Sequence, residues 1–265
     1  MTIKEALDYL NTYGWSQWKL GLSRTEDLLR LLGNPQKRLR FVHVAGSNGK
    51  GSTCAMVERI LREAGYVTGF YPSPYIEDFR ERIQVCGEYI PEDALARITA
   101  RVRDLAKTME DHPTQFELIT AIGMVWFAEQ KCDLVVLEVG LGGTFDSTNV
   151  IDAPEVCVIT NIGYCHLENL GDRDGVLRAK TEMFQYLKKD GVIIHEAVRP
   201  LLSSELISEC LAQLERHDGC MPVLPLNDTI YQSDDGRRLS GLAFLTHGRT
   251  HMGISLLIIL VLLLT

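Results

Sequence analysis

The fold is decided by residues 41–53, which read FVHVAGSNGKGST. The apolar run Phe41–Val44 predicts a buried strand, and the stretch Thr53–Ala64 predicts a helix that stops at Gly65. Glycines between a strand and a helix let backbone N–H groups converge on a phosphate, and the helix N-terminus adds its positive end. The loop therefore predicts a nucleotide-phosphate site, although a glycine-rich turn with a solvated lysine is the alternative. The residues expected to bind the phosphates or their magnesium ion are Gly46, Asn48, Gly49, Lys50, Gly51, Ser52 and Thr53.

The rest of the chain repeats the alternation of apolar runs and helical stretches. Such continuous apolar runs alternating with helices indicate an α/β fold with a mostly parallel sheet and helices on both faces. Asp235-Gly236 lies between two further apolar runs and predicts a late hairpin. The further strands are predicted at 67–71, 134–139, 156–162, 192–195 and 221–226, and the hairpin strands at 229–232 and 239–246. The helices are predicted near 2–13, 25–32, 92–107, 116–130, 176–187 and 201–216.

Two side chains follow strands that are expected to end beside the phosphate loop. Glu138 ends the run 134–139, and His166 follows the run 156–162. Because ligands bind at the carboxyl ends of parallel strands, both should lie on the same edge of the sheet as Lys50. Magnesium prefers oxygen ligands, so Glu138 is a natural partner and His166 a less usual one. A solvated acid and a hydrogen-bonded loop histidine are the alternatives, and the other six histidines are expected to be structural or on the surface.

The composition is that of an ordinary globular protein. The chain has 265 residues, of which 46% are hydrophobic and 23% charged, and its net charge is 27 − 35 = −8. An acidic balance argues against nonspecific nucleic-acid binding, which needs a basic face. The seven cysteines are scattered and form no Cys-x-x-Cys pair, which favours reduced thiols and a cytoplasmic location. We also expect a monomer that does not associate with membranes.

The C-terminal end has a different character. Residues 254–264 are apolar except for Ser255, and eleven residues are too few to cross a bilayer as a helix. A short buried element and a membrane-touching tail are two interpretations. We favour a third, in which the reading frame ends abnormally. The expected organisation is a nucleotide-binding domain over residues 1–253, followed by an aberrant aliphatic tail over residues 254–265.

Five motifs in order resemble the family of folylpolyglutamate synthase and dihydrofolate synthase, within the Mur ligase superfamily. The phosphate loop is the first of them. Residues 71–75 (YPSPY) resemble the family's Ser-Pro loop, and residues 79–83 (FRERI) resemble its Asn-Glu-Arg-Ile run. Residues 116–120 (FELIT) resemble the start of a family helix, and residues 138–149 (EVGLGGTFDSTN) resemble its glycine-rich stretch. The resemblance covers about residues 1–255 and implies a fold of the Mur ligase central-domain type.

The resemblance also implies roles for individual residues. Ser73, Glu138 and His166 match the magnesium ligands of the family, and Lys180 matches a lysine that is carbamylated there. The expected catalytic residues are Lys50, Glu138, His166 and Lys180. The positions expected to contact the pterin or folate are Phe116, Glu117, Phe145, Asp146 and Ser147.

The implied activity is the ATP-dependent ligation of L-glutamate to a folate through an acyl phosphate, with ATP and Mg²⁺ as cofactors. Phosphoryl transfer of this kind depends on positioning and charge neutralisation. Family members run to roughly 420 residues or more, and the C-terminal domain that supplies the glutamate site is not matched here. The resemblance therefore implies that residues 1–253 are an ATP-binding ligase domain that is incomplete at its C-terminal end. The alternatives are an inactive remnant that still binds nucleotide, a Mur-type ligase acting on a cell-wall precursor, or a generic P-loop NTPase.

Overall fold

In the computed structural model, residues 1–12, 21–140, 146–152 and 154–160 are described in full. Three further segments, residues 192–195, 230–232 and 241–243, are described as backbone strands. The chain forms two compact units, Met1–Ala197 and Val198–Thr265. The described part of the second unit is the strand pair β8 (Ile230–Gln232) and β9 (Gly241–Ala243), which is antiparallel. This pair confirms the predicted late hairpin.

A seven-stranded sheet forms the centre of the first unit, in the order β4-β3-β2-β5-β1-β6-β7. The strands β2, β5, β1, β6 and β7 are parallel, as the alternation of strands and helices predicted. Their bounds are Phe41–Ala45 (β1), Thr68–Tyr71 (β2), Leu134–Glu138 (β5), Val156–Ile159 (β6) and Val192–His195 (β7). In the register of β1 and β5, Val44 lies opposite Glu138, so both strands end at the same level.

The antiparallel edge of the sheet was not predicted. Strands β3 (Gln84–Val85) and β4 (Glu88–Tyr89) form a hairpin that pairs with β2. The turn between them is Cys86-Gly87, and both residues have positive φ angles of 50° and 80°. Such a pair of left-handed residues matches the twist of a tight hairpin. Strands of two residues are too short to show any alternation of apolar and polar side chains, so sequence periodicity could not reveal them.

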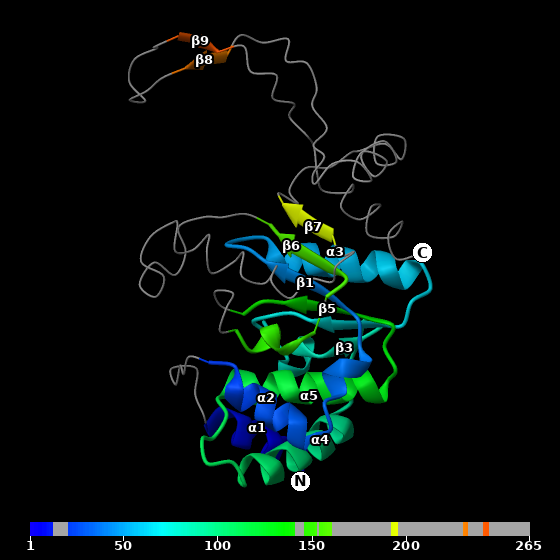
Figure 1. The fold of residues 1–265 in the computed structure, drawn as a ribbon. Helices are drawn as coiled ribbons and strands as arrows, with labels where there is room; N and C mark the ends of the chain where they lie inside the picture. Colours follow the sequence, from blue (N-terminus) through cyan, green and yellow to red (C-terminus); the bar gives the residue numbers. More distant parts are fainter. Residues whose placement is uncertain are drawn as a thin grey trace. The chain divides into compact units, whose positions relative to one another are not determined.

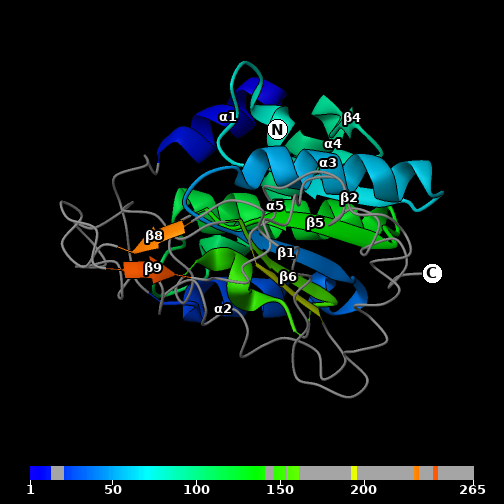
Figure 2. The same ribbon diagram turned by 90° about the horizontal axis from the view of Figure 1, so that it is seen from above.

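Helices cover both faces of the sheet, as Figures 1 and 2 show. Four helices pack together on one face, where their apolar side chains form one core with Phe41, Tyr71, Val135 and Leu137 of the strands. Alternate residues of the same strands, such as Val136, point to the other face. The helices of the first face are α1 (Ile3–Thr12), α2 (Ser23–Leu31), α4 (Glu92–Ala106) and α5 (Gln115–Glu129).

Helix α3 (Lys50–Glu63) contacts β1, β2 and β5. It begins three residues before the predicted start at Thr53, because Gly49 adopts a left-handed conformation with φ of 77° and ends the loop there. Three short 3₁₀ helices complete the described elements: η1 (Pro35–Arg38), η2 (Phe79–Arg82) and η3 (Ser147–Val150). No helix in the described part of the chain is long and apolar enough to cross a membrane.

The predicted helices at 176–187 and 201–216 and the strand at 221–226 lie outside the described residues. The described helices α1, α2, α4 and α5 match the predicted ones to within two residues at each end. Helix α5 begins with a capping box, in which Thr114 Oγ1 accepts the N–H of Glu117 and the Glu117 carboxylate accepts the N–H of Thr114.

Candidate functional site at the carboxyl ends of the parallel strands

The loop between β1 and α3 has the geometry of a phosphate cradle. It leaves the end of the central strand at Gly46 and enters the helix at Lys50. Gly46 and Gly49 have φ angles of 149° and 77°, which are accessible to glycine and strained for other residues. The ammonium group of Lys50 donates to the carbonyl oxygen of Gly46 at 3.2 Å, so its charge stays at the mouth of the loop. The first turn of α3 contains Gly51 and Ser52, whose N–H groups point toward the helix N-terminus, whereas the N–H of Thr53 donates to the carbonyl oxygen of Gly49 at 3.0 Å.

Glu138 lies beside this loop, at the tip of the neighbouring strand β5. A side chain at Gly51 would place its Cβ only 3.4 Å from Glu138 Oε2. The same oxygen accepts the backbone N–H of Ser73, which follows β2, at 2.9 Å. The structure therefore brings Lys50, Gly51, Ser73 and Glu138 together from three elements, as the sequence predicted for Lys50 and Glu138 at one edge of the sheet.

The Glu138 carboxyl is 3% exposed, and burial raises its pKa above the usual range. The N–H of Ser73 and the positive charges of Lys50 and Arg82 act in the opposite direction and favour the carboxylate. Positive charges near a buried acid favour its ionised form, which is the form that binds a metal ion. The Glu138 carboxylate fits Mg²⁺, which proteins bind through one or two carboxylates and which keeps several waters.

Arg82 is a cation of this site that the sequence analysis did not assign. Its side chain is fully buried, and its guanidinium lies 5.3 Å from the centre of the Tyr75 ring. Burial lowers its pKa, and the neighbouring tyrosines and Glu138 oppose that shift. Buried arginines are rare unless an anion or an aromatic ring stabilises them. Its place in the run 79–83 was visible in the sequence, but its burial was not.

Three of the residues expected to bind the pterin or folate lie together on the other side of β5. A Cβ at Gly140 would lie 2.7 Å from the Phe116 ring and 3.0 Å from Asp146 Oδ2. Phe116 also packs on Tyr71, with ring centroids 6.1 Å apart. Thr120 Oγ1 connects Tyr71 to Ser147 through contacts of 3.0 and 3.5 Å. The site thus combines an aromatic surface with one carboxylate.

Glu117 is engaged in a different way. Its oxygen Oε2 accepts from Arg24 Nε at 3.2 Å and from the Thr114 N–H at 2.6 Å, and its Oε1 lies 3.1 Å from Arg24 Nη2. Glu117 and Arg24 are both buried. This ion pair fastens α2 to the start of α5. Contact between Glu117 and a substrate stays a prediction, and both of its oxygens already have partners in the protein.

Two buried side chains with clear partners were given no functional role from the sequence. Thr160, directly after β6, donates from Oγ1 to the carbonyl oxygen of Asn48 at 2.6 Å. His43, in the middle of β1, contacts Thr148 Oγ1 at 2.9 Å, and that hydroxyl donates to Asp146 at 2.5 Å. Burial lowers the pKa of His43 to about 3, so the ring is neutral. A lone threonine or histidine in the sequence carries no signal for such long-range bonds.

The remaining predicted site residues, Phe145, His166 and Lys180, lie outside the described residues. Among the residues that the structure describes, no group of three His, Cys, Asp or Glu side chains is close enough to hold a metal ion. Of the predicted metal ligands, the structure brings Ser73 and Glu138 together, through the hydrogen bond from the Ser73 N–H to Glu138 Oε2.

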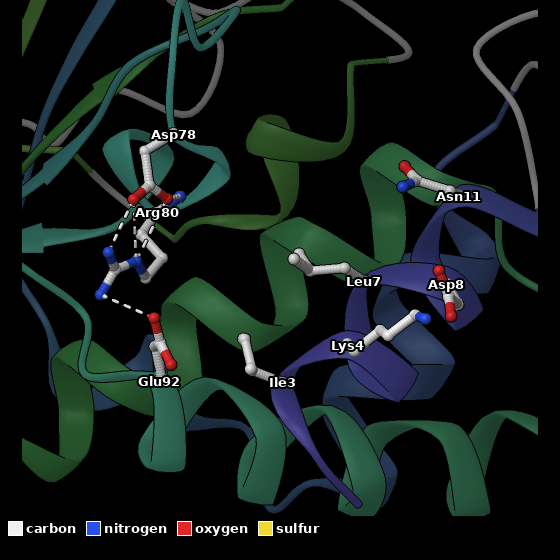
Figure 3. Close-up of a pocket in the computed structure, with 8 residues that line it drawn as sticks. All are labelled: Ile3, Lys4, Leu7, Asp8, Asn11, Asp78, Arg80 and Glu92. Atoms are coloured by element: carbon white, nitrogen blue, oxygen red, sulfur yellow. Dashed lines mark hydrogen bonds and ion pairs between the residues drawn. The ribbon is translucent and has the colours of Figure 1, made fainter.

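A cavity of about 480 Å³ lies elsewhere, between α1, η2 and the start of α4 (Figure 3). Arg80 is one of its lining residues and pairs with Asp78 at 2.7 Å and with Glu92 at 3.8 Å. None of the predicted site residues lines this cavity. Its lining residues are Ile3, Lys4, Leu7, Asp8, Asn11, Asp78, Arg80 and Glu92.

Comparisons with known proteins relate this chain to a family and to solved structures. The family model "Mur ligase middle domain" matches residues 44–210. The dihydrofolate synthase/folylpolyglutamate synthase of Bacillus subtilis is 46% identical over 159 residues, which are 58% of this chain and 37% of that protein. The apo structure of L. casei folylpolyglutamate synthase has a TM-score of 0.69 and 34% identity over 74% of this chain. The complex of the same enzyme with AMPPCP and folate has a TM-score of 0.67 and the same 34% identity.

A mostly parallel sheet with a glycine-rich loop after its central strand and an acid at the adjacent strand tip is the architecture of a P-loop type α/β domain. The match of the family model over residues 44–210 identifies the family. The chain belongs to the Mur ligase family and contains its middle domain. It spans about half or less of the length of the relatives it matches, with 37% of the Bacillus subtilis protein and 48% of the L. casei structure covered.

Proposed function

We propose that this chain binds ATP at residues 46–53 together with Mg²⁺ held by Ser73, Glu138 and His166, and that it takes part in the ATP-dependent ligation of L-glutamate to a folate. The observation that carries the proposal is the meeting of the phosphate loop, Lys50 and the Glu138 carboxylate at two adjacent strand tips. The names of the relatives support the substrate class, since those proteins are dihydrofolate and folylpolyglutamate synthases, and one solved complex holds AMPPCP and folate.

In the proposed reaction, the terminal phosphoryl group of ATP passes to a carboxylate oxygen of the folate, which gives an acyl phosphate and ADP. The amino group of glutamate then attacks the acyl carbon, an amide bond forms, phosphate leaves, and a proton is released. Developing negative charge on the transferred phosphoryl group must be neutralised for this reaction. Lys50 and the N–H groups at the start of α3 supply that positive potential in this chain.

Ser73, Glu138 and His166 would hold the Mg²⁺ ion, of which Ser73 and Glu138 lie next to each other in the structure. The bound ion would supply positive charge that offsets the charge of the phosphates. Lys180, as a carbamate, would add a negative group near the metal. The aromatic surface of Phe116, with Asp146 and Ser147, would receive the pterin ring.

Both parts of the proposal can be measured on the purified chain. Titration calorimetry with ATP and Mg²⁺ tests nucleotide binding, and a phosphate-release assay tests turnover. We expect phosphate release only when ATP, Mg²⁺, a folate and glutamate are all present. Lys50→Ala should abolish ATP binding, whereas the exposed Lys107→Ala should leave it unchanged.

Each outcome has a distinct meaning. Binding without turnover would support a nucleotide-binding chain that does not complete the ligation by itself. Hydrolysis that needs no folate would favour a generic NTPase, and turnover with a cell-wall precursor in place of folate would favour a Mur-type ligase. Absence of ATP binding would overturn the proposal. A cytoplasmic location and a monomeric state stay predictions.

A further inference from the structure

Thr160 is the last fully described residue after β6, and its side chain reaches across to the phosphate loop. It is completely buried, and its own N–H donates to the carbonyl oxygen of Ala45 at 2.9 Å. That bond continues the pairing of β6 with β1 to the last residue of β1. The position of Thr160 is therefore set by the two central strands and not by the loop itself.

From this fixed position, the Thr160 hydroxyl makes two close approaches to the loop. It donates to the carbonyl oxygen of Asn48 at 2.6 Å, which is a short hydrogen bond for two neutral groups. It also lies where a Cβ at Gly46 would be, only 1.8 Å from that point. Gly46 thus leaves room for the hydroxyl, and the hydroxyl determines where the carbonyl of Asn48 points.

The direction of that carbonyl decides the direction of an N–H group. In a planar trans peptide, the C=O of one residue and the N–H of the next point in opposite directions. Because the Asn48 carbonyl is held toward β6, the N–H of Gly49 points away from β6. A phosphate cradle needs such N–H groups on its concave side, and a carbonyl oxygen in their place would repel an anion.

We propose that Thr160 is a positioning residue for nucleotide binding: its hydroxyl fixes the Asn48–Gly49 peptide so that the Gly49 N–H faces the phosphates. The inference rests on the proposed binding of ATP at this loop. Thr160 itself touches the loop backbone and does not act on the reacting atoms. Its effect is on the affinity for phosphates, through the orientation of one peptide.

A pair of variants separates the hydroxyl from the shape of the side chain. Thr160→Val keeps the branched shape and removes the donor, whereas Thr160→Ser keeps the donor. We expect Thr160→Val to weaken binding of ATP with Mg²⁺ about tenfold by calorimetry, which corresponds to the loss of one good hydrogen bond. Thr160→Ser should bind within about twofold of the unchanged chain.

A matched control separates positioning from general stability. Thr68 is also fully buried, and its hydroxyl donates to Glu58 at 2.7 Å, away from the loop. Thr68→Val should lower the urea midpoint of unfolding to a similar extent as Thr160→Val, while ATP affinity stays unchanged. If both variants weaken ATP binding equally, the role of Thr160 is only structural and the proposal is overturned.

The orientation of the peptide can be read directly, whether or not the chain binds ATP. In a crystal structure of Thr160→Val, we expect the Asn48–Gly49 peptide to be rotated or to take two orientations. An unchanged peptide in that structure, or ATP affinity within twofold of the unchanged chain, would overturn the proposal. Failure of the unchanged chain to bind ATP would overturn the proposed function instead, and the crystal structure would still decide the role of Thr160.

Discussion

Replacing Glu117 by glutamine tests whether the buried ion pair with Arg24 holds the helical face of the domain together. The carboxylate accepts two bonds from Arg24, at 3.2 and 3.1 Å, and one from the Thr114 N–H at 2.6 Å. The side chains of Arg24 and Glu117 are only 8% and 6% exposed. Although burial lowers the pKa of Arg24, the bond and charge of Glu117, with help from Asp111, raise it above the ordinary value.

The magnitude follows from what glutamine can and cannot replace. Removing one partner of a buried ion pair costs about 3–5 kcal/mol, since the other charge is left buried without compensation. Glutamine keeps the shape and one acceptor oxygen, which can still receive the Thr114 N–H. Its NH₂ group would face the Arg24 guanidinium, donor against donor. We therefore expect a loss at the lower end, about 3 kcal/mol of unfolding free energy.

Urea unfolding followed by far-ultraviolet circular dichroism measures this loss. The control is Asp111→Asn, because Asp111 contacts the same Arg24 at 3.2 Å but its side chain is 56% exposed. An exposed partner contributes about 1 kcal/mol or less, so the control variant should remain close to the unchanged chain. A cost below about 1 kcal/mol for Glu117→Gln would refute the reasoning. A normal stability combined with lost folate binding would instead assign Glu117 to the substrate.

Two further variants test the site, and a third tests the effect of the buried His43 on stability. Glu138→Ala should abolish ATP-dependent phosphate release and leave the circular dichroism spectrum intact; a collapsed spectrum would show that Glu138 is a structural residue. Gly46→Ala should weaken ATP binding at least about tenfold in calorimetry, because its Cβ would lie 1.8 Å from Thr160 Oγ1 at a φ of 149°; unchanged affinity would contradict this. His43→Gln should remove part of the acid sensitivity of the fold. Because burial lowers the pKa of His43 to about 3 while its ordinary value is 6.5, the unfolded chain takes up a proton that the folded chain excludes. Stability should therefore fall by about 2 kcal/mol as the pH drops from 7.5 to 5, and urea unfolding at both pH values should show a smaller fall in the variant.

Local features of the fold could be predicted from the residues alone. The phosphate loop is contiguous, and its glycines, lysine and helix start all lie within residues 46–53. The strands that carry three or four apolar residues in a row, such as β5 and β6, were also recognisable, since burial on both faces leaves that pattern. The hairpin Gln84–Tyr89 was missed because two-residue strands leave no pattern at all.

Some features of the candidate site could also be predicted from the sequence, and others could not. Lys50 and Glu138 could be expected on one edge because parallel strands share a direction, and the register of Val44 with Glu138 confirms it. The burial of Arg82 under Tyr75 and the ion pair of Arg24 with Glu117 could not be anticipated. The ion pair joins two residues that are far apart in the sequence, and the burial of Arg82 depends on which neighbours exclude water from it. Neither feature leaves a pattern in the local sequence.

The contiguous string FVHVAGSNGKGST already predicts a strand, a phosphate loop and a helix start, because an apolar run, closely spaced glycines and a following lysine and hydroxyl are signals that lie next to each other in the sequence. The order of strands β2, β5, β1 and β6 was decided only in three dimensions. That order places Ser73 and Glu138 on one flank of the loop and Thr160 on the other. Contacts of this kind arise from the packing of whole elements, and a packing arrangement is a property of the folded chain and not of any single segment.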